Sequence, residues 1–184
     1  MRASLNDNVL YKNLYELRIY GNHRRTQVRK FGENMPNESF LNQVRVAAQD
    51  PNRALRLTLD HFHAETGTIH ELGSDGVLHL TAWTDGIPDH LLPLIRNIPV
   101  GKGIAGLAVE RQEPVDLCNL QTDESGTARP KARETGIKGS ICVPMMDDDR
   151  AVGALGIGTV EEREFRADEI ELLMAVGRLL AQKP

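Results

Sequence analysis

Four histidines lie near one another in the sequence and are the first side chains to consider as metal ligands. His61 and His63 fall in a segment with helical periodicity, where residues two positions apart point about 200° away from each other. They could not share one metal ion. His70 and His79 would face each other across a hairpin, but two ligands do not make a stable zinc site. The sequence therefore predicts structural or surface histidines and no metal centre.

Two cysteines, Cys118 and Cys142, are the candidates for thiol chemistry. They could form at most one disulfide, and two thiols cannot make a four-thiolate zinc site. Both fall at or within predicted strands, which favours small core residues. A redox switch, or an attachment site for nitric oxide or a bilin, stays open as the alternative.

Gly101, Gly103 and Gly106 match the G-x-G-x-x-G pattern of dinucleotide-binding sites. That chemistry needs a strand before the glycines and a long helix after them, so that the helix N-terminus meets the pyrophosphate. Residues 91–99, which precede the glycines, contain two prolines and are predicted to be helical, and the following helix must end before Pro114. The glycines are therefore interpreted as turn positions that need unusual backbone angles.

Hydrophobic periodicity and turn signals predict the elements that would position these residues. Helices are predicted over residues 39–48, 51–65, 89–96, 103–111 and 167–182. Strands are predicted over residues 67–72, 77–83, 114–118, 140–146 and 151–159. Hairpin turns join them at 73–76 and 147–149, where three adjacent carboxylates are interpreted as solvated. This order of elements predicts an α+β domain with an antiparallel sheet.

Length and charge limit the classes of protein to consider. The 184 residues suit one domain with a helical extension. A formal net charge of −4 offers no excess positive field for nucleic acid. The longest nearly apolar run, residues 151–160, is too short to cross a membrane, and the N-terminus lacks the apolar stretch of a signal peptide. The sequence therefore predicts a cytoplasmic protein with neither a membrane nor a nucleic acid as its partner.

Residues 1–36 differ in charge from the rest of the chain and mark a boundary. They carry seven Lys or Arg and three acids, whereas the predicted domain of residues 37–184 is acidic. Leu10, Leu14 and Leu17 lie at i, i+4 and i+7, which predicts an amphipathic helix followed by a basic linker. The apolar stripe of this helix needs a partner, and a second copy of the same helix is the simplest one. A homodimer through the N- and C-terminal helices is therefore expected.

A set of motifs after residue 100 resembles the GAF domain family. The glycine turn is followed by Pro114-Val115, Ser140 with Val143-Pro144, Val152, Gly153 and Leu155, then Phe165, Glu169, Leu172 and Leu173. The resemblance covers roughly residues 38–182. It implies an antiparallel sheet with helices on one face and a ligand pocket on the other. It also implies a stand-alone sensory module that binds a small molecule and signals through dimer-forming terminal helices, or a ligand-free module that only dimerises.

Alternation along the strands suggests which side chains would face such a pocket. If the helices cover the more uniformly apolar sheet face, the pocket receives His79, Thr81 and Trp83 from one strand and Ser140 and Cys142 from another, with Cys118 at the end of a third. The following loop adds hydroxyl and basic groups: Thr127, Arg129, Lys131, Arg133 and Lys138. Such groups would suit an anionic ligand, for example a carboxylate or a phosphate. A solvated loop without a ligand is the alternative.

One subgroup of the GAF family reduces free methionine sulfoxide. It needs a reactive cysteine on the helix after the glycine turn and others in the pocket loop. This sequence has Ile104-Ala105 at the first place and no cysteine between residues 119 and 141. The departure predicts a binding module rather than an enzyme, with a cysteine-based redox sensor or reductase as the distant alternative. No cofactor follows from the sequence.

Overall fold

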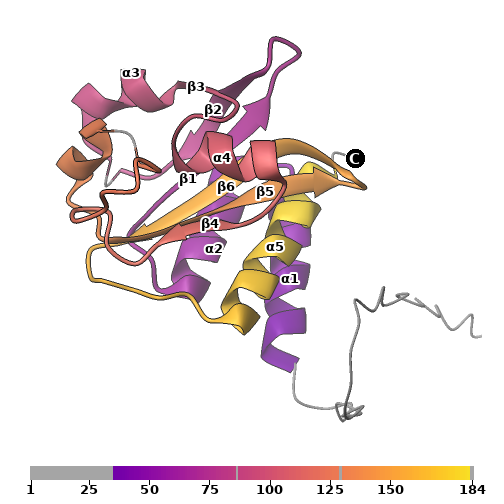
Figure 1. The fold of residues 1–184 in the computed structure, drawn as a ribbon. Helices are drawn as coiled ribbons and strands as arrows, with labels where there is room; N and C mark the ends of the chain where they lie inside the picture. Colours follow the sequence, from indigo (N-terminus) through magenta and orange to yellow (C-terminus); the bar gives the residue numbers. More distant parts are fainter. Residues whose placement is uncertain (1–34, 86, 129, 183–184) are drawn as a thin grey trace, which may run out of the picture. The chain divides into compact units, whose positions relative to one another are not determined.

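The computed structural model describes residues 35–85, 87–128 and 130–182. The predicted amphipathic helix of residues 10–19 and the basic linker after it lie outside this range. Thirteen elements follow one another along the described chain (Figure 1): α1 (Met35–Ala47), α2 (Pro51–Phe62), β1 (Thr66–Leu72), β2 (Val77–Trp83), η1 (Asp89–Leu91), α3 (Leu92–Ile95), β3 (Asn97–Pro99), α4 (Gly103–Arg111), β4 (Val115–Leu117), η2 (Pro130–Thr135), β5 (Gly139–Asp147), β6 (Arg150–Thr159) and α5 (Ala167–Ala181).

The strands form one six-stranded sheet in the order β3-β2-β1-β6-β5-β4. Every neighbouring pair is antiparallel, and β6 lies between β1 and β5. The predicted α+β class with an antiparallel sheet is therefore confirmed. The short edge strand β3 was not predicted, because residues 97–99 follow a helical segment and carry no alternation of their own.

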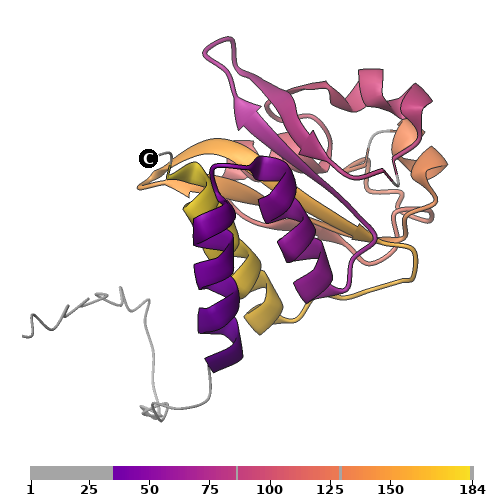
Figure 2. The same cartoon turned by 180° about the vertical axis from the view of Figure 1, so that it is seen from behind.

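Helices α1, α2 and α5 lie side by side on one face of the sheet (Figures 1 and 2). Their apolar stripes pack on Ile141, Val143, Leu155 and Ile157, all at most 2% exposed. Local capping fixes where the helices begin and end. Asp50 accepts a hydrogen bond from the backbone N–H of Arg53 at 3.1 Å and precedes Pro51 at the first helical position. Helix α2, which these two residues begin, ends before His63, whose backbone is left-handed with φ 51°.

The opposite face of the sheet has a smaller apolar cluster beneath α4. This cluster contains Leu78, Ile98, Ala108, Val109, Val115, Cys142, Ala151 and Ala154. It covers only part of that face, because the strand residues beyond Ala154 toward the end of β6 line a cavity instead. None of the helices in the described ranges is long and apolar enough to cross a membrane.

Arg163 joins the C-terminal end of α2 to the N-terminal end of α5. Its guanidinium donates to the Phe62 carbonyl oxygen at 2.6 Å and to Glu169 at 2.8 Å, and lies 4.7 Å from the centre of the Phe165 ring. Burial tends to raise the pKa of the Glu169 carboxyl, but the backbone N–H of Arg166 and the Arg163 guanidinium outweigh it and hold the pKa below its usual range. The partly buried ion pair thus ties two helices that are distant in the sequence.

Replacing Arg163 with Met tests this tie. We expect the free energy of unfolding to fall by about 2 kcal/mol near pH 7, because the Phe62 carbonyl and Glu169 lose a charged donor. The stabilisation from Glu169 is present above the pKa of an unfolded glutamate, about 4.3, and is lost as the pH falls through the lower folded-state pKa. Urea unfolding across this range should therefore show a weaker acid destabilisation in R163M than in the wild type.

The matched control is Arg166→Met, because Arg166 pairs with Asp168 and, at 3.6 Å, with the same Glu169, but its side chain is 68% exposed. Exposed pairs contribute less than about 1 kcal/mol. If R163M were no less stable than R166M, the tie between α2 and α5 would have no energetic role.

Candidate functional site

A cavity of about 510 Å³ lies against the sheet face opposite α1, α2 and α5. Three parts of the chain enclose it: η1 with α3, the first turn of α4, and the segment of residues 119–138 between β4 and β5, which we call the flap. Most of the lining is apolar: Ile87, Leu91, Leu94, Ile95, Ile98, Ile104, Ala105, Leu120, Ala128, Ala132 and Ile137. The volume and the apolar lining are those of a small-molecule site.

The floor of the cavity consists of two cross-strand rows, each with one residue from β1, β6 and β5. The rows are Thr66, Gly158 and Ser140, and Thr68, Gly156 and Cys142. Each row has a glycine in the middle, so β6 contributes no side chain to the floor; we call this strip the glycine trough. The Ile137 side chain lies over Gly158, where a Cβ would be 2.9 Å from Ile137 Cγ2. A Cβ at Gly156 would lie 3.3 Å from Thr68 Oγ1 and 3.4 Å from Cys142 Sγ. The missing side chains let a ligand approach the backbone between the flanking polar groups.

Two lysines stand among the cavity-lining residues. Lys102 precedes the first turn of α4, and Lys131 lies on η2 in the flap; both are exposed. Neither forms an ion pair among the described residues, and no carboxylate belongs to the described lining. The cavity therefore offers positive charge without an internal counter-ion.

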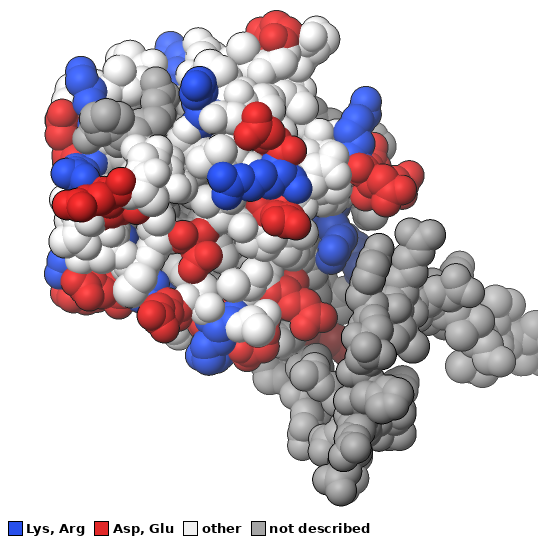
Figure 3. All heavy atoms as spheres, in the orientation of Figure 1, with Lys and Arg blue, Asp and Glu red and all other residues white. Residues whose placement is uncertain are grey.

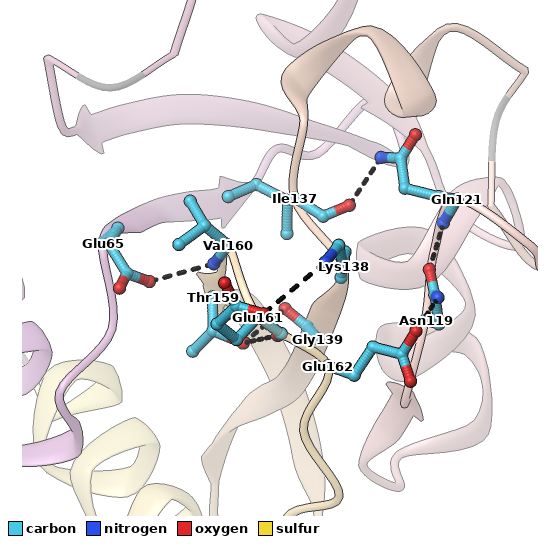
Figure 4. Close-up of polar contacts among 10 residues, drawn as sticks. All are labelled: Glu65, Asn119, Gln121, Ile137, Lys138, Gly139, Thr159, Val160, Glu161 and Glu162. Carbon is cyan, nitrogen blue, oxygen red and sulfur yellow. Dashed lines mark hydrogen bonds and ion pairs between the residues drawn. The ribbon is translucent and has the colours of Figure 1, made fainter.

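Hydrogen bonds fix the flap at its base. The backbone N–H of Leu120 donates to the Lys138 carbonyl oxygen at 2.7 Å, and the Gln121 side chain donates to that of Ile137 at 2.6 Å. Asn119 also donates to Glu162, and Lys138 Nζ lies 3.5 Å from a carboxylate oxygen of Glu161, as Figure 4 shows. The two ends of the flap are thus held together and to the segment that follows β6.

Two contacts hold the walls above the sheet. His90 on η1 lies 3.2 Å from Glu134 on η2, with both side chains at least half exposed, so this link between the walls is weak. His70 on β1 is 1% exposed, and its Nε2 donates to the Ile95 carbonyl oxygen at 2.8 Å. Burial lowers the pKa of His70, so the neutral ring holds α3 to the sheet. No three His, Cys, Asp or Glu side chains gather as a metal site in the described ranges.

None of the three residues predicted from β2 lines the cavity. Trp83 lies on the predicted face of the sheet, because it pairs with the cavity-lining Thr68, whereas the predicted orientation of His79 is wrong. His79 contacts Asp75 and Asn97 outside it, and hydrogen bonds to these residues raise its pKa. Thr81 donates to the Ile69 carbonyl oxygen, and Trp83, 42% exposed, pairs with Thr68 but is not part of the lining. The physical reason for His79 is a β-bulge: Ile69 pairs with Ala82 and His70 with Leu80, so Thr81 is the extra residue and the alternation reverses between Trp83 and His79.

The other predicted residues divide between lining and non-lining positions. Ser140 and Cys142 line the cavity. Arg133 donates to the Asp123 carbonyl oxygen, and Lys138 pairs with Glu161, so neither belongs to the lining; Arg129 lies outside the described residues.

The two cysteines have different environments. Cys142 is buried, as expected for a core residue, and its thiol pKa is raised by burial to about 12. Cys118 is free and exposed, so its prediction as a core residue is wrong. It directly follows the short edge strand β4, where the chain leaves the sheet.

Comparisons with known proteins agree with this architecture. A family model described as GAF domain matches residues 48–182. The GAF domain of a Coxiella burnetii phosphoenolpyruvate-protein phosphotransferase is 20% identical with a TM-score of 0.67, over 82% of this chain and 93% of that chain. Free methionine-R-sulfoxide reductase from Neisseria meningitidis, solved in complex with its substrate, is 15% identical with a TM-score of 0.63, over 83% and 92%. A search of the curated proteins found no match. At these identities the solved structures show a shared fold.

The cysteine environments predict selective labelling. At neutral pH the native protein should take up one iodoacetamide group, on Cys118, because the buried Cys142 stays a thiol with a pKa of about 12. The unfolded protein should take up two, and C118S should take up none while native. Mass spectrometry of the labelled protein reads the result. Native labelling of C118S would contradict the described position of Cys142.

Proposed function

Because this chain belongs to the GAF domain family, we propose that it is a regulatory module that binds a small molecule between the sheet and the flap. The observation that carries the proposal is the cavity of about 510 Å³, with its apolar walls and few polar groups. A module that only dimerises needs no cavity, and close packing of side chains over this part of the sheet would stabilise its fold. The cavity therefore favours a module that binds a ligand.

The ligand of this proposal is mainly apolar and carries an anionic group. The apolar walls supply most of its contact surface, and Lys102 and Lys131 supply positive charge without a carboxylate beside them. A group with several negative charges fits less well, because the described lining offers two cations, both exposed to solvent. On the face shown in Figure 3, acidic and basic side chains are interspersed, which disfavours a nucleic acid as partner.

Binding rather than catalysis is the proposed activity. Cys142 is the cysteine that lines the cavity, and with a pKa of about 12 its thiol is a poor nucleophile at neutral pH. Free, unpaired cysteines, one of them exposed, suit a reducing compartment, so the module is proposed to act in the cytoplasm.

Signalling is proposed to pass through a homodimer of the terminal helices. Helices α1 and α5 contact each other on the sheet face away from the cavity. Val46 on α1 is 75% exposed, a large apolar side chain left in water on the outer side of this helix layer. A second copy of the chain would cover it.

Decanoate, an apolar chain with one carboxylate, tests the proposed binding. We expect saturable binding by calorimetry, weaker by about threefold to fivefold in Lys131→Met and Lys102→Met, since exposed charge pairs contribute up to about 1 kcal/mol. Decanol should bind the wild type and these variants equally. Lys138→Met is the matched control, because Lys138 pairs with Glu161 outside the lining. Absence of binding by both compounds would favour the ligand-free dimerisation module.

Val46→Asp tests the proposed dimer. Sedimentation should show the wild type as a dimer and V46D shifted toward monomer, because a carboxylate in an apolar interface is costly to desolvate. The control is Gln112→Glu, an exposed position directly after α4 and therefore on the opposite side of the sheet. A V46D protein with unchanged mass would remove this side of α1 from the interface.

A further inference from the structure

Three hydroxyl groups beside the glycine trough have no hydrogen-bond partner in the part of the chain that the structure describes. Thr66 and Thr68 on β1 and Ser140 on β5 line the cavity and are half-buried, and none of their hydroxyls forms a hydrogen bond among the described residues. Thr135, by contrast, also lines the cavity but donates to the Ala132 carbonyl oxygen at 2.7 Å. The three free hydroxyls converge on one strip of floor, because register places them on both sides of β6.

The missing side chain of Gly156 leaves the backbone of β6 open to the ligand between Thr68 and Cys142. A Cβ there would lie 3.3 Å from Thr68 Oγ1 and 3.4 Å from Cys142 Sγ, so a ligand group that approaches the Gly156 backbone comes close to both side chains. Such a group would lie beside the Thr68 hydroxyl, which can both donate and accept hydrogen bonds, with the Ser140 hydroxyl in the next row of the floor. A hydrocarbon there would cover the hydroxyls and leave them unsatisfied.

We infer that the glycine trough selects an oxygen-bearing group on the ligand, so that the molecule bound is a hydroxy- or oxo-substituted organic acid with an apolar body. This inference rests on the proposed function. The two lysines are charged and exposed, whereas the hydroxyls of the floor are neutral and half-buried. We therefore expect the carboxylate to bind beside the lysines and the oxygen substituent to bind beside the hydroxyls. An ionised group in the trough would have hydroxyls but no cation among the six floor residues, which disfavours the carboxylate at that place.

Discrimination between related acids tests the inference. Calorimetry on the full chain compares decanoate with 3-hydroxydecanoate and 10-hydroxydecanoate, which place the oxygen near to and far from the carboxylate. We expect at least one hydroxy acid to bind about tenfold more tightly than decanoate, because covering a hydroxyl without a partner costs about that factor in affinity. Equal or weaker binding of both hydroxy acids overturns the inference and leaves the proposed function standing. Failure of all three acids and of decanol to bind overturns both.

Three variants locate the discrimination in the trough. Thr68→Val and Ser140→Ala remove a free hydroxyl, and Gly156→Ala fills the trough with a methyl group that has room there. In each, the preference for the hydroxy acid should fall to about threefold or less, while decanoate still binds. Ser39→Ala on α1, far from the lining, is the control and should keep the full preference. A preference that survives in the T68V/S140A double variant, shown to be folded by its thermal melt, contradicts the inference.

Discussion

The central strand β6 carries large side chains on one face and almost none on the other, and the two halves of the molecule depend on this asymmetry. Leu155 and Ile157 point toward α1, α2 and α5 and form the middle of the main core. On the opposite face, Ala154 is followed by Gly156 and Gly158, whose neighbours are the cavity and its floor. Because a strand presents alternate residues to alternate faces, one stretch of sequence both anchors the helices and creates the hollow.

The segments that cover the cavity, α4, η1, α3 and the flap, do not fill it with side chains. Helix α4 packs its apolar side on the small cluster around Ala154, while η1, α3 and the flap are short or irregular and cannot present a continuous apolar stripe. Their positions depend on a few polar contacts: His70 with the Ile95 carbonyl and the hydrogen bonds at the flap base. A cavity enclosed in this way can exchange a ligand through movement of its walls, while the helix-covered face stays packed.

The sequence allows the elements and the sheet class to be predicted, because hydrophobic periodicity and turn residues are local signals. The site was predicted only in part. Alternation places Ser140 and Cys142 correctly on β5, but fails for His79 on β2, because the bulge at Thr81 reverses it. Thr66, Thr68 and the two trough glycines were missed, because their significance lies in the register of three strands, which is a long-range property. The one local signal of the trough was the alternation of Gly156, Ile157 and Gly158, which indicates a strand face without side chains. Arg163 was missed because its partners, Phe62 and Glu169, meet only in the folded chain.

The central claim is that the space between the sheet and the flap is where a small molecule binds. Amide hydrogen exchange of the full chain with and without saturating decanoate tests it most directly, because exchange reports which segments a ligand stabilises. The account predicts slower exchange in residues 87–98 and 119–138, the walls of the cavity, and little change in α2. Protection confined to α1 and α5, or no protection while decanoate is bound, would contradict it.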